Sequence, residues 1–413
     1  MARMHASLAR VLLPAATAAL LAIPPGSAQA PLAPAQAPAA APAPAAPPLP
    51  PPAPYAQAFE KAVGDVLQNA KVPDGARVDL LIDPLVDGNT GAQSSATRSM
   101  EAQVRALIVA RFADKFQVQP FTTDNVAKNP FVFIGTFTPI HATAGTIGPK
   151  DAYRLCFAVL DLKSKLIVSK GFARATPQGI NPVPTPAFAS GPLWLKDASI
   201  EGYVKTCQGT KAGDPINPVY LERITVASLV SDGIQAYDEG RYAQALDVYT
   251  RAKALPGGDQ LRVHNGLYLA NLKLNRKADA DKALGELVDF GQKGERLGMM
   301  MLFVNNSTTF MPSTIAPAYP AWLKAIAAKS AAASACLEVV GHASHTGTEA
   351  ANDRLSAQRA AAIRARLALL SPPLAKTLKS SGQGWRENIV GNGRDDVTDA
   401  LDRRVEFKVA KCG

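Results

Sequence analysis

The side chains best suited to acid–base chemistry or metal binding fall into two small groups. Asp83, Asp87 and Asn89 follow an apolar run, at the kind of strand end where α/β proteins place their ligands. His342 and His345 have His-x-x-His spacing, which holds a metal ion only with further ligands, and the neighbouring sequence offers none. Glycine-rich nucleotide loops and the Gly-x-Ser-x-Gly nucleophile turn are missing from the sequence. We therefore expect no catalytic centre, no cofactor and no metal site, and interpret residues 87–89 as a tight turn.

The first 55 residues have the composition of a secretory leader followed by a spacer. Arg3 and Arg10 precede a short apolar stretch, and small residues then lead to a cleavage position after Ala28. Residues 29–55 consist almost only of Pro, Ala, Leu and Gln. Such a segment cannot bury a core and favours an extended polyproline conformation. The sequence predicts a signal peptide at 1–28, a linker at 29–55 and a periplasmic location.

The composition of the 413 residues excludes several classes of protein. The net charge is +10, but the basic residues are dispersed and aromatic residues make up only 6% of the chain, so a base-stacking nucleic-acid surface is not expected. After the leader, no apolar run reaches the roughly 18 residues that a membrane helix needs. The mature chain is therefore predicted to lack a transmembrane span and to bind no nucleic acid.

Four cysteines follow the leader, and an oxidising compartment favours their pairing. Four cysteines permit three pairings, and the sequence alone leaves these open. Cys336 and Cys412 each lie at the end of a predicted strand, which favours a disulfide between them and leaves Cys156 to pair with Cys207. Their spacing does not resemble that of a zinc site.

Residues 56–215 are predicted to form a small α/β domain. Helices are expected over residues 55–68 and 95–116, the latter with Ser94 or Ser95 at its N-cap. Strands are expected over 78–85 and 131–137, and a hairpin over 153–160 and 166–173. The hairpin resembles periplasmic domains of the curli-secretion or lipoprotein-cofactor kind through Gly135-Thr136-Phe137-Thr138, Tyr153-Arg154, Asp161-Leu162 and Ile167-Val168.

Residues 219–293 are predicted to be helical. Their small and aromatic residues are spaced in a way that resembles the tetratricopeptide repeat, in which small residues let paired helices approach closely. The residues concerned are Gly233, Gly240, Tyr242, Ala245, Tyr249, Ala252 and Pro256. Two copies are too few for a free solenoid, so the helices are expected to pack on a neighbouring domain. They are interpreted either as a protein-binding surface or as a helical spacer.

Residues 297–412 alternate predicted strands and helices. Strands are expected over 299–304 and 337–340, and helices over 321–334 and 352–370. The segment also carries a set of motif residues, which are Gly341-His342, Thr346-Gly347, Asn352, Leu355-Ser356, Arg359-Ala360, Gly382, Gly384 and Arg403-Arg404-Val405. Through these residues it resembles the OmpA-like peptidoglycan-binding family, and the resemblance implies an α/β sandwich.

The resemblance implies a pocket for the diaminopimelate side chain of the peptidoglycan stem. In the family an Asp pairs with the ligand's ammonium, and an Arg fifteen residues later holds its carboxylate with a planar fork. Here Arg359 takes the place of that Arg, whereas Ser344 stands where the Asp would be. Asn352, Leu355 and Arg404 complete the expected peptidoglycan-binding set, with Arg404 chosen over its neighbour because successive strand residues face opposite ways.

Two functional hypotheses follow from this organisation. The first is a non-enzymatic cell-envelope protein that docks on peptidoglycan and contacts other envelope proteins through its N-terminal and helical domains. The second is a periplasmic assembly or scaffold factor whose C-terminal domain no longer binds peptidoglycan. The residue at position 344 bears on the choice between them. A charge-assisted hydrogen bond contributes about 1.5–3 kcal/mol, whereas the neutral hydroxyl of Ser344 offers a hydrogen bond of about 1 kcal/mol, which weakens binding to peptidoglycan.

Overall fold

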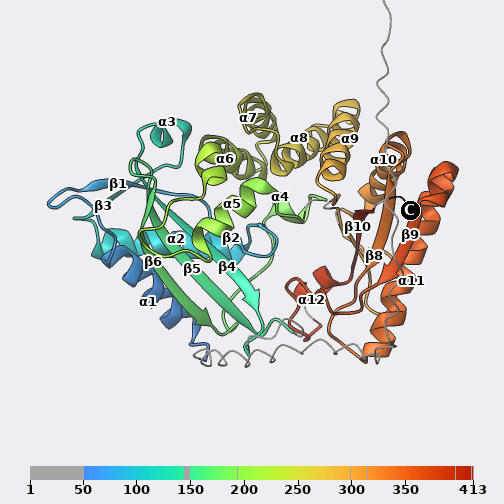
Figure 1. Cartoon of the computed structure of the whole chain (residues 1–413), viewed down its shortest axis with the longest axis horizontal. Coiled ribbons are helices and arrows are strands. Elements are labelled where there is room, and N and C mark those ends of the chain that lie inside the picture. Colours follow the sequence, from blue (N-terminus) through green and yellow to red (C-terminus); the bar gives the residue numbers. More distant parts are fainter. Residues whose placement is uncertain are drawn as a thin grey trace, which may run out of the picture. The chain divides into compact units, whose positions relative to one another are not determined.

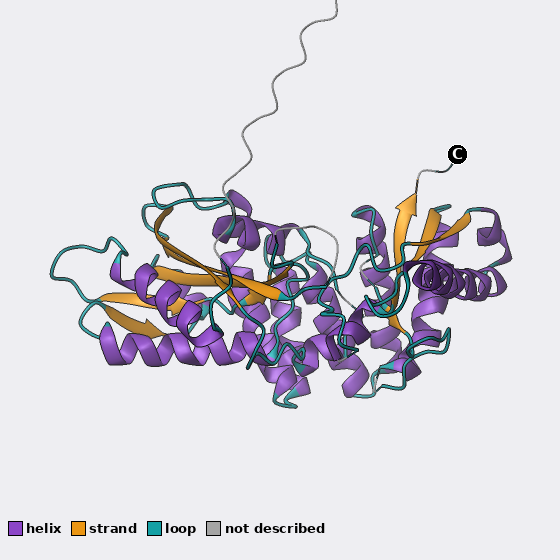
Figure 2. Cartoon of the chain, turned by 90° about the horizontal axis from the view of Figure 1, so that it is seen from below, coloured by secondary structure: helices purple, strands orange, loops and turns teal. Residues whose placement is uncertain are grey.

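The structure is a computed structural model that describes residues 51–143, 149–192, 194–297, 299–313, 315–395, 397–410 and Cys412. The predicted signal peptide and all of the predicted linker before residue 51 lie outside these ranges. The described strands fall into two separate sheets (Figure 2), one in the N-terminal and one in the C-terminal part of the chain.

The N-terminal sheet has the strand order β3-β1-β4-β5-β6, and β2 pairs with β4. Its strands are β1 (Val78–Ile82), β2 (Val86–Asp87), β3 (Phe116–Gln119), β4 (Phe131–Ile140), β5 (Ala152–Asp161) and β6 (Leu166–Ala175). β1 runs parallel to both β3 and β4, whereas β5 runs antiparallel to its neighbours on both sides. The predicted hairpin is thus formed by β5 and β6.

Helices cover both faces of this sheet. α1 (Tyr55–Gln68) and α2 (Ser95–Arg111) share one apolar core with Leu80 of β1, while α5 (Ala198–Cys207) shares another with Leu81. Adjacent strand residues reach opposite cores because side chains alternate across a sheet. The connections also contain two short helices, α3 (Thr123–Val126) and α4 (Pro186–Ala189).

Local patterning predicted some boundaries well and others poorly. α1 has the predicted bounds, and Ser94 caps α2 by accepting a hydrogen bond from the backbone N–H of Thr97 at 3.3 Å. The helix expected to continue to residue 116 ends at Arg111, because Phe116 begins β3 and pairs with β1. Ala53, assigned to the linker, forms a β-bridge with Ala175, so the sheet already includes part of that segment.

Four consecutive helices follow, and Figure 1 shows them between the two sheets. They are α6 (Pro218–Asp238), α7 (Tyr242–Ala254), α8 (Leu261–Lys273) and α9 (Lys277–Lys293). The ring of Tyr249 on α7 lies against Gly233 and Gly266, where an added Cβ would come within 2.8 and 2.3 Å of it. Small residues therefore let these helices approach closely, as the sequence pattern indicated. The tetratricopeptide assignment itself stays a prediction, as does the resemblance proposed for residues 56–215.

The C-terminal sheet has the order β7-β10-β8-β9 and is packed against helices. Its elements are β7 (Met301–Leu302), the 3₁₀ turn η1 (Ala316–Ala318), α10 (Tyr319–Ala332), β8 (Cys336–Gly341), α11 (Glu349–Leu370), the 3₁₀ turn η2 (Pro372–Lys376), β9 (Leu378–Gly382), α12 (Val397–Asp402) and β10 (Arg404–Ala410). The strand expected over 299–304 is only two residues long, because its pairing with β10 is limited to Met301 and Leu302. Both predicted helices begin two or three residues earlier than expected.

Shared cores and buried contacts join these parts into one compact unit. α6 contributes Tyr220 and Ile224 to the core below the N-terminal sheet. On the other side, the indole N–H of Trp322 on α10 donates to the hydroxyl of Tyr268 on α8 at 2.9 Å. Among the described helices, none is long and apolar enough to cross a membrane.

Both predicted disulfides are confirmed. Cys156 on β5 is bonded to Cys207 at the end of α5, with 6.1 Å between their Cα atoms. Cys336 at the start of β8 is bonded to Cys412 beyond the end of β10, with a Cα–Cα distance of 5.3 Å. The second bond thus links the ends of two neighbouring antiparallel strands, as the sequence analysis favoured.

Candidate functional site

The loop between β8 and α11 holds Ser344, and α11 itself holds three more of the residues expected to bind peptidoglycan. A Cβ on Gly341 would lie 1.9 Å from the backbone oxygen of Ser356, so the end of β8 packs directly on the α11 backbone and only glycine fits there. Thr348 caps α11 by accepting a hydrogen bond from the N–H of Ala351. These two features fix the loop of residues 342–347 over the start of the helix.

Ser344, Thr346 and Asn352 form a small polar network in this loop. The hydroxyls of Ser344 and Thr346 are 3.0 Å apart, and the Asn352 side-chain amide donates to the carbonyl of Thr346 at 3.0 Å. Ser344 and Asn352 are both buried. The structure therefore brings two of the predicted residues together and adds Thr346, whose place in the resemblance motif was the signal that could have identified it.

Arg359 lies in the interior of the domain and makes three hydrogen bonds to backbone carbonyls. Its Nε donates to Ser307 at 2.9 Å, Nη1 to His342 at 3.0 Å and Nη2 to Val304 at 2.9 Å. The residue is 0% exposed, and burial together with the charge of Arg403 lowers its pKa to about 10. Because a guanidinium has five N–H donors, two remain available for another acceptor.

The remaining predicted residues are Leu355, one helical turn before Arg359 on α11, and Arg404 at the start of β10. Leu355 is half-buried on α11. Arg404 points to the opposite side of β10, where its Nη2 donates to the carbonyl of Glu387 at 3.0 Å and its Nε to the carboxylate of Glu406. Arg403 is the residue whose charge acts on Arg359. The two neighbouring arginines thus act on different groups, as expected, but the sequence does not reveal which of them acts on Arg359.

The acidic residues at the start of α11 and the end of α12 already have partners. Glu349 and Asp353, on the first turns of α11, lie 2.6 Å from the guanidinium nitrogens of Arg386. Asp402 is buried and accepts backbone hydrogen bonds from Ile389 at 2.6 Å and Gly391 at 2.7 Å, so it organises that loop. Burial raises the pKa of Asp402 to about 6.

His342 is enclosed at the end of β8. It is 1% exposed, and neither ring nitrogen has a hydrogen-bond partner among the described residues. Burial and then the charge of Arg404 hold its pKa well below the ordinary value, so the imidazole is neutral at pH 7. In the part of the chain that the structure describes, no group of three His, Cys, Asp or Glu residues is arranged to hold a metal ion.

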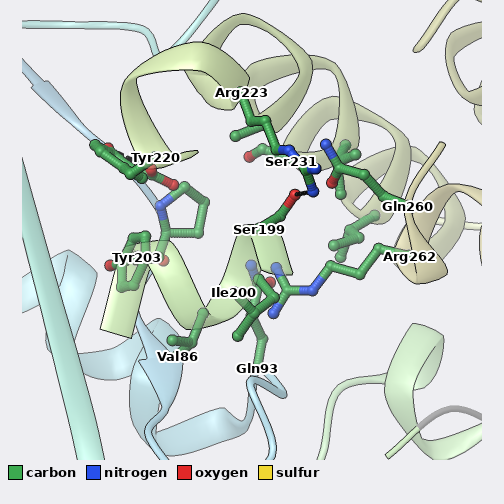
Figure 3. A pocket seen from close by; sticks show the side chains of 15 residues that line it. Val86, Gln93, Ser199, Ile200, Tyr203, Tyr220, Arg223, Ser231, Gln260 and Arg262 are labelled. Atoms are coloured by element: carbon green, nitrogen blue, oxygen red, sulfur yellow. Dashed lines mark hydrogen bonds between the residues drawn. The ribbon is translucent and has the colours of Figure 1, made fainter. Parts of the chain in front are cut away.

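A second polar centre lies where the N-terminal sheet meets the helices (Figure 3). The hydroxyl of Tyr220 donates to the carboxylate of Asp83 at 2.8 Å, and burial raises the pKa of Asp83 to about 7. Tyr203 donates to the carbonyl of Gly135 at 3.0 Å, and Arg262 approaches from α8. The cavity between them measures about 40 Å³, enough for roughly three water molecules.

Of the three polar residues that the sequence singled out after the first strand, this second centre contains Asp83 but neither Asp87 nor Asn89. Asp83 lies at the end of β1, as expected, whereas the carboxylate of Asp87 accepts hydrogen bonds from the backbone of Asn89 at 2.7 Å and Thr90 at 2.8 Å. Residues 87–90 therefore form a self-capped turn. The tyrosines and Arg262 were missed because they come from helices more than a hundred residues away in sequence, and no local pattern marks them.

The geometry of the C-terminal part defines an α/β domain in which a loop is held between a strand and a long helix by a buried arginine. Residues 303–400 match the family model described as the OmpA family. This segment of the chain is accordingly an OmpA-family domain, as the sequence motifs indicated.

Several solved structures are similar to part of the chain. The peptidoglycan-associated lipoprotein from Burkholderia pseudomallei is 22% identical, with 27% of this chain and 89% of that chain covered and a TM-score of 0.24. The OmpA-like domain of FopA1 from Francisella tularensis subsp. tularensis SCHU S4 is 18% identical over 28% and 75%, with a TM-score of 0.22. The LpoB C-terminal domain from Salmonella enterica is 16% identical over 29% and 96%, also with a TM-score of 0.22. A comparison with curated proteins finds no match.

Proposed function

We propose that this chain is a non-enzymatic, periplasmic cell-envelope protein that docks on peptidoglycan through its OmpA-family domain. Its N-terminal domain and α6–α9 would contact other envelope proteins. The observation that supports this proposal most strongly is the match of residues 303–400 to the OmpA family, with Ser344, Asn352 and Arg359 at the matching places of the motif.

The proposed ligand group is the zwitterionic end of a diaminopimelate side chain. Its carboxylate would accept the two N–H donors of Arg359 that the backbone carbonyls leave available. Its ammonium would meet the hydroxyl of Ser344, supported by Thr346 and Asn352. Because Ser344 has no charge, we expect affinity about ten-fold lower than that of a pocket with a carboxylate at this position.

A sedimentation assay with purified sacculi tests the proposal. The chain without residues 1–28 is mixed with sacculi, and the bound fraction is compared with that of Arg359→Lys, which keeps the charge but loses the planar fork. Arg354→Lys is the matched control, since Arg354 is exposed on the same helix. Loss of binding in Arg359→Lys alone supports the pocket, whereas an intact chain that stays in the supernatant contradicts it.

One observation favours the scaffold alternative. Arg359 is 0% exposed and already binds three carbonyls, and Glu349 and Asp353 both pair with Arg386. In a scaffold protein this arginine would only tie the segment after β7 to β8. Absence of sacculus binding by both the intact chain and Ser344→Asp would favour this alternative, because the substitution returns the charge that the family pocket uses.

A further inference from the structure

A polar groove lies between the N-terminal domain and the OmpA-family domain, apart from the Ser344–Arg359 pocket. It measures about 380 Å³, which lies within the range of pockets that hold small molecules. Trp194 and Lys196 line it from one side, and Arg386, Asn388 and Arg404 from the other. Both domains must therefore be in place for the groove to exist.

Backbone and side-chain hydrogen bonds hold the two walls together. The Asn89 amide, on the self-capped turn of residues 87–90, donates to the carbonyls of Pro139 at 3.2 Å and Ile389 at 3.1 Å. The backbone N–H of Lys150 donates to the carbonyl of Gly391 at 2.8 Å. The turn that the sequence singled out thus serves to join the N-terminal domain to the loop that Asp402 organises.

The groove contains polar atoms whose hydrogen-bonding capacity is not met by the described residues. The Arg404 side chain is only 3% exposed, and its Nη1 has no hydrogen-bond partner among the described residues, the carboxylate of Asp402 being 3.7 Å away. Both amide atoms of Asn388 are enclosed, and they too are unpartnered within the part of the chain that the structure describes. Because buried polar atoms are costly to leave unsatisfied, these donors and acceptors are available to a ligand that enters the groove.

The charges and the single indole of the lining define the kind of ligand. Five cationic side chains and three carboxylates line the groove. The cations are Lys150, Lys196, Arg296, Arg386 and Arg404, and the carboxylates are Glu201, Glu387 and Glu406. Arg386 is already paired with Glu349 and Asp353, so the donor that an anionic ligand would use is Nη1 of Arg404, and arginine suits a carboxylate. Trp194 offers a flat apolar face and a polar N–H, which together suit the ring of a sugar.

We propose that this groove binds a carboxylate-bearing amino sugar, with its ring on Trp194 and its carboxylate toward Arg404 and Asn388. The choice of a wall sugar rests on the proposed function. N-acetylmuramic acid and N-acetylglucosamine are matched probes, because they share one ring and differ in the lactyl carboxylate. Titration calorimetry on the chain without residues 1–28 should show at least about ten-fold tighter binding of the acid, weakened by added salt.

Substitutions in the groove make the assignment specific. Asn388→Asp places a negative charge beside the ligand with almost no change in side-chain volume. It should lower the affinity for N-acetylmuramic acid about ten-fold and have little effect on the affinity for N-acetylglucosamine. Trp194→Leu should lower the affinity for both sugars by the same factor. Lys379→Ala, exposed on β9 outside the groove, is the control and should change neither affinity.

The outcomes separate this inference from the proposed function. Equal affinity for the two sugars, or an unchanged affinity in Asn388→Asp, overturns the groove assignment even if the chain sediments with sacculi. Selective binding of the acid by a chain that fails to sediment supports the groove and contradicts peptidoglycan docking. If Asn388→Asp lowers both sugar and sacculus binding, the groove takes stretches of the polymer whose lactyl carboxylate carries no stem peptide. If it lowers only sugar binding, the groove takes the released sugar acid.

Discussion

Replacing Asp83 by asparagine should change how the stability of the chain depends on pH. Asp83 is 6% exposed, and burial raises the pKa of its carboxyl from 3.8 to about 7, opposed by the hydrogen bond from Tyr220 and the charge of Arg262. Since the folded state binds the proton more tightly than the unfolded chain, this group destabilises the fold increasingly as pH rises. The stabilising contribution of the protonated Asp83 carboxyl is complete below about pH 4 and is lost as the pH passes through about 7.

The size of the effect follows from the difference in pKa. A rise from 3.8 to about 7 is about 3 pH units, which corresponds to about 4 kcal/mol at most. Asparagine keeps an acceptor for the Tyr220 hydroxyl but carries no charge at any pH. The free energy of unfolding of Asp83→Asn, minus that of the unchanged chain, should therefore increase by up to about 4 kcal/mol between pH 4 and pH 8.

Urea unfolding at a series of pH values, followed by fluorescence without reducing agent, measures this difference directly. Asp74→Asn is the control, because Asp74 is exposed in the turn before β1. A difference between Asp83→Asn and the unchanged chain that stays constant from pH 4 to pH 8 would refute the reasoning. It would mean that the Asp83 carboxyl is not desolvated at the junction of the N-terminal sheet with α6.

Three further predictions concern the OmpA-family domain. Replacing Cys336 and Cys412 by serine should lower the free energy of unfolding by roughly 4 kcal/mol in urea, because the bond joins residues 76 apart, and a reducing agent should remove the difference. Gly341→Ala should destabilise by about 1–3 kcal/mol, since its Cβ would overlap the Ser356 backbone, whereas Gly64→Ala, with open space in α1, should stabilise by up to about 1 kcal/mol. Ser344→Asp should tighten sacculus binding about ten-fold in a sedimentation titration, and an unchanged affinity would exclude Ser344 from the pocket.

Elements with strong local patterns could be predicted from the sequence. The apolar spacing of α1 and the alternation of the β5–β6 hairpin are properties of neighbouring residues, and both elements were predicted to within two residues at each end. The disulfide between Cys336 and Cys412 could be favoured because each cysteine adjoins a recognisable strand. By contrast, β3 and the true end of α2 depend on pairing with β1, more than thirty residues away, which no local pattern encodes.

The candidate site was predictable in its residue types but not in its contacts. The motif identified Arg359 and Ser344, yet the partners of Arg359 include Val304 and Ser307, which lie more than fifty residues earlier, and no local pattern pairs them with Arg359. Alternation predicted that only one of Arg403 and Arg404 approaches the pocket, and Arg404 was chosen, whereas the charge that acts on Arg359 is that of Arg403. The groove could not be predicted at all, because its walls come from two domains.

Sedimentation of the chain with purified sacculi is the most direct test of the account. We predict that the chain without residues 1–28 binds sacculi, that Arg354→Lys binds equally well, and that Arg359→Lys loses at least about ten-fold in affinity. Failure of the intact chain to bind, or equal binding by Arg359→Lys and the intact chain, would contradict docking through this pocket.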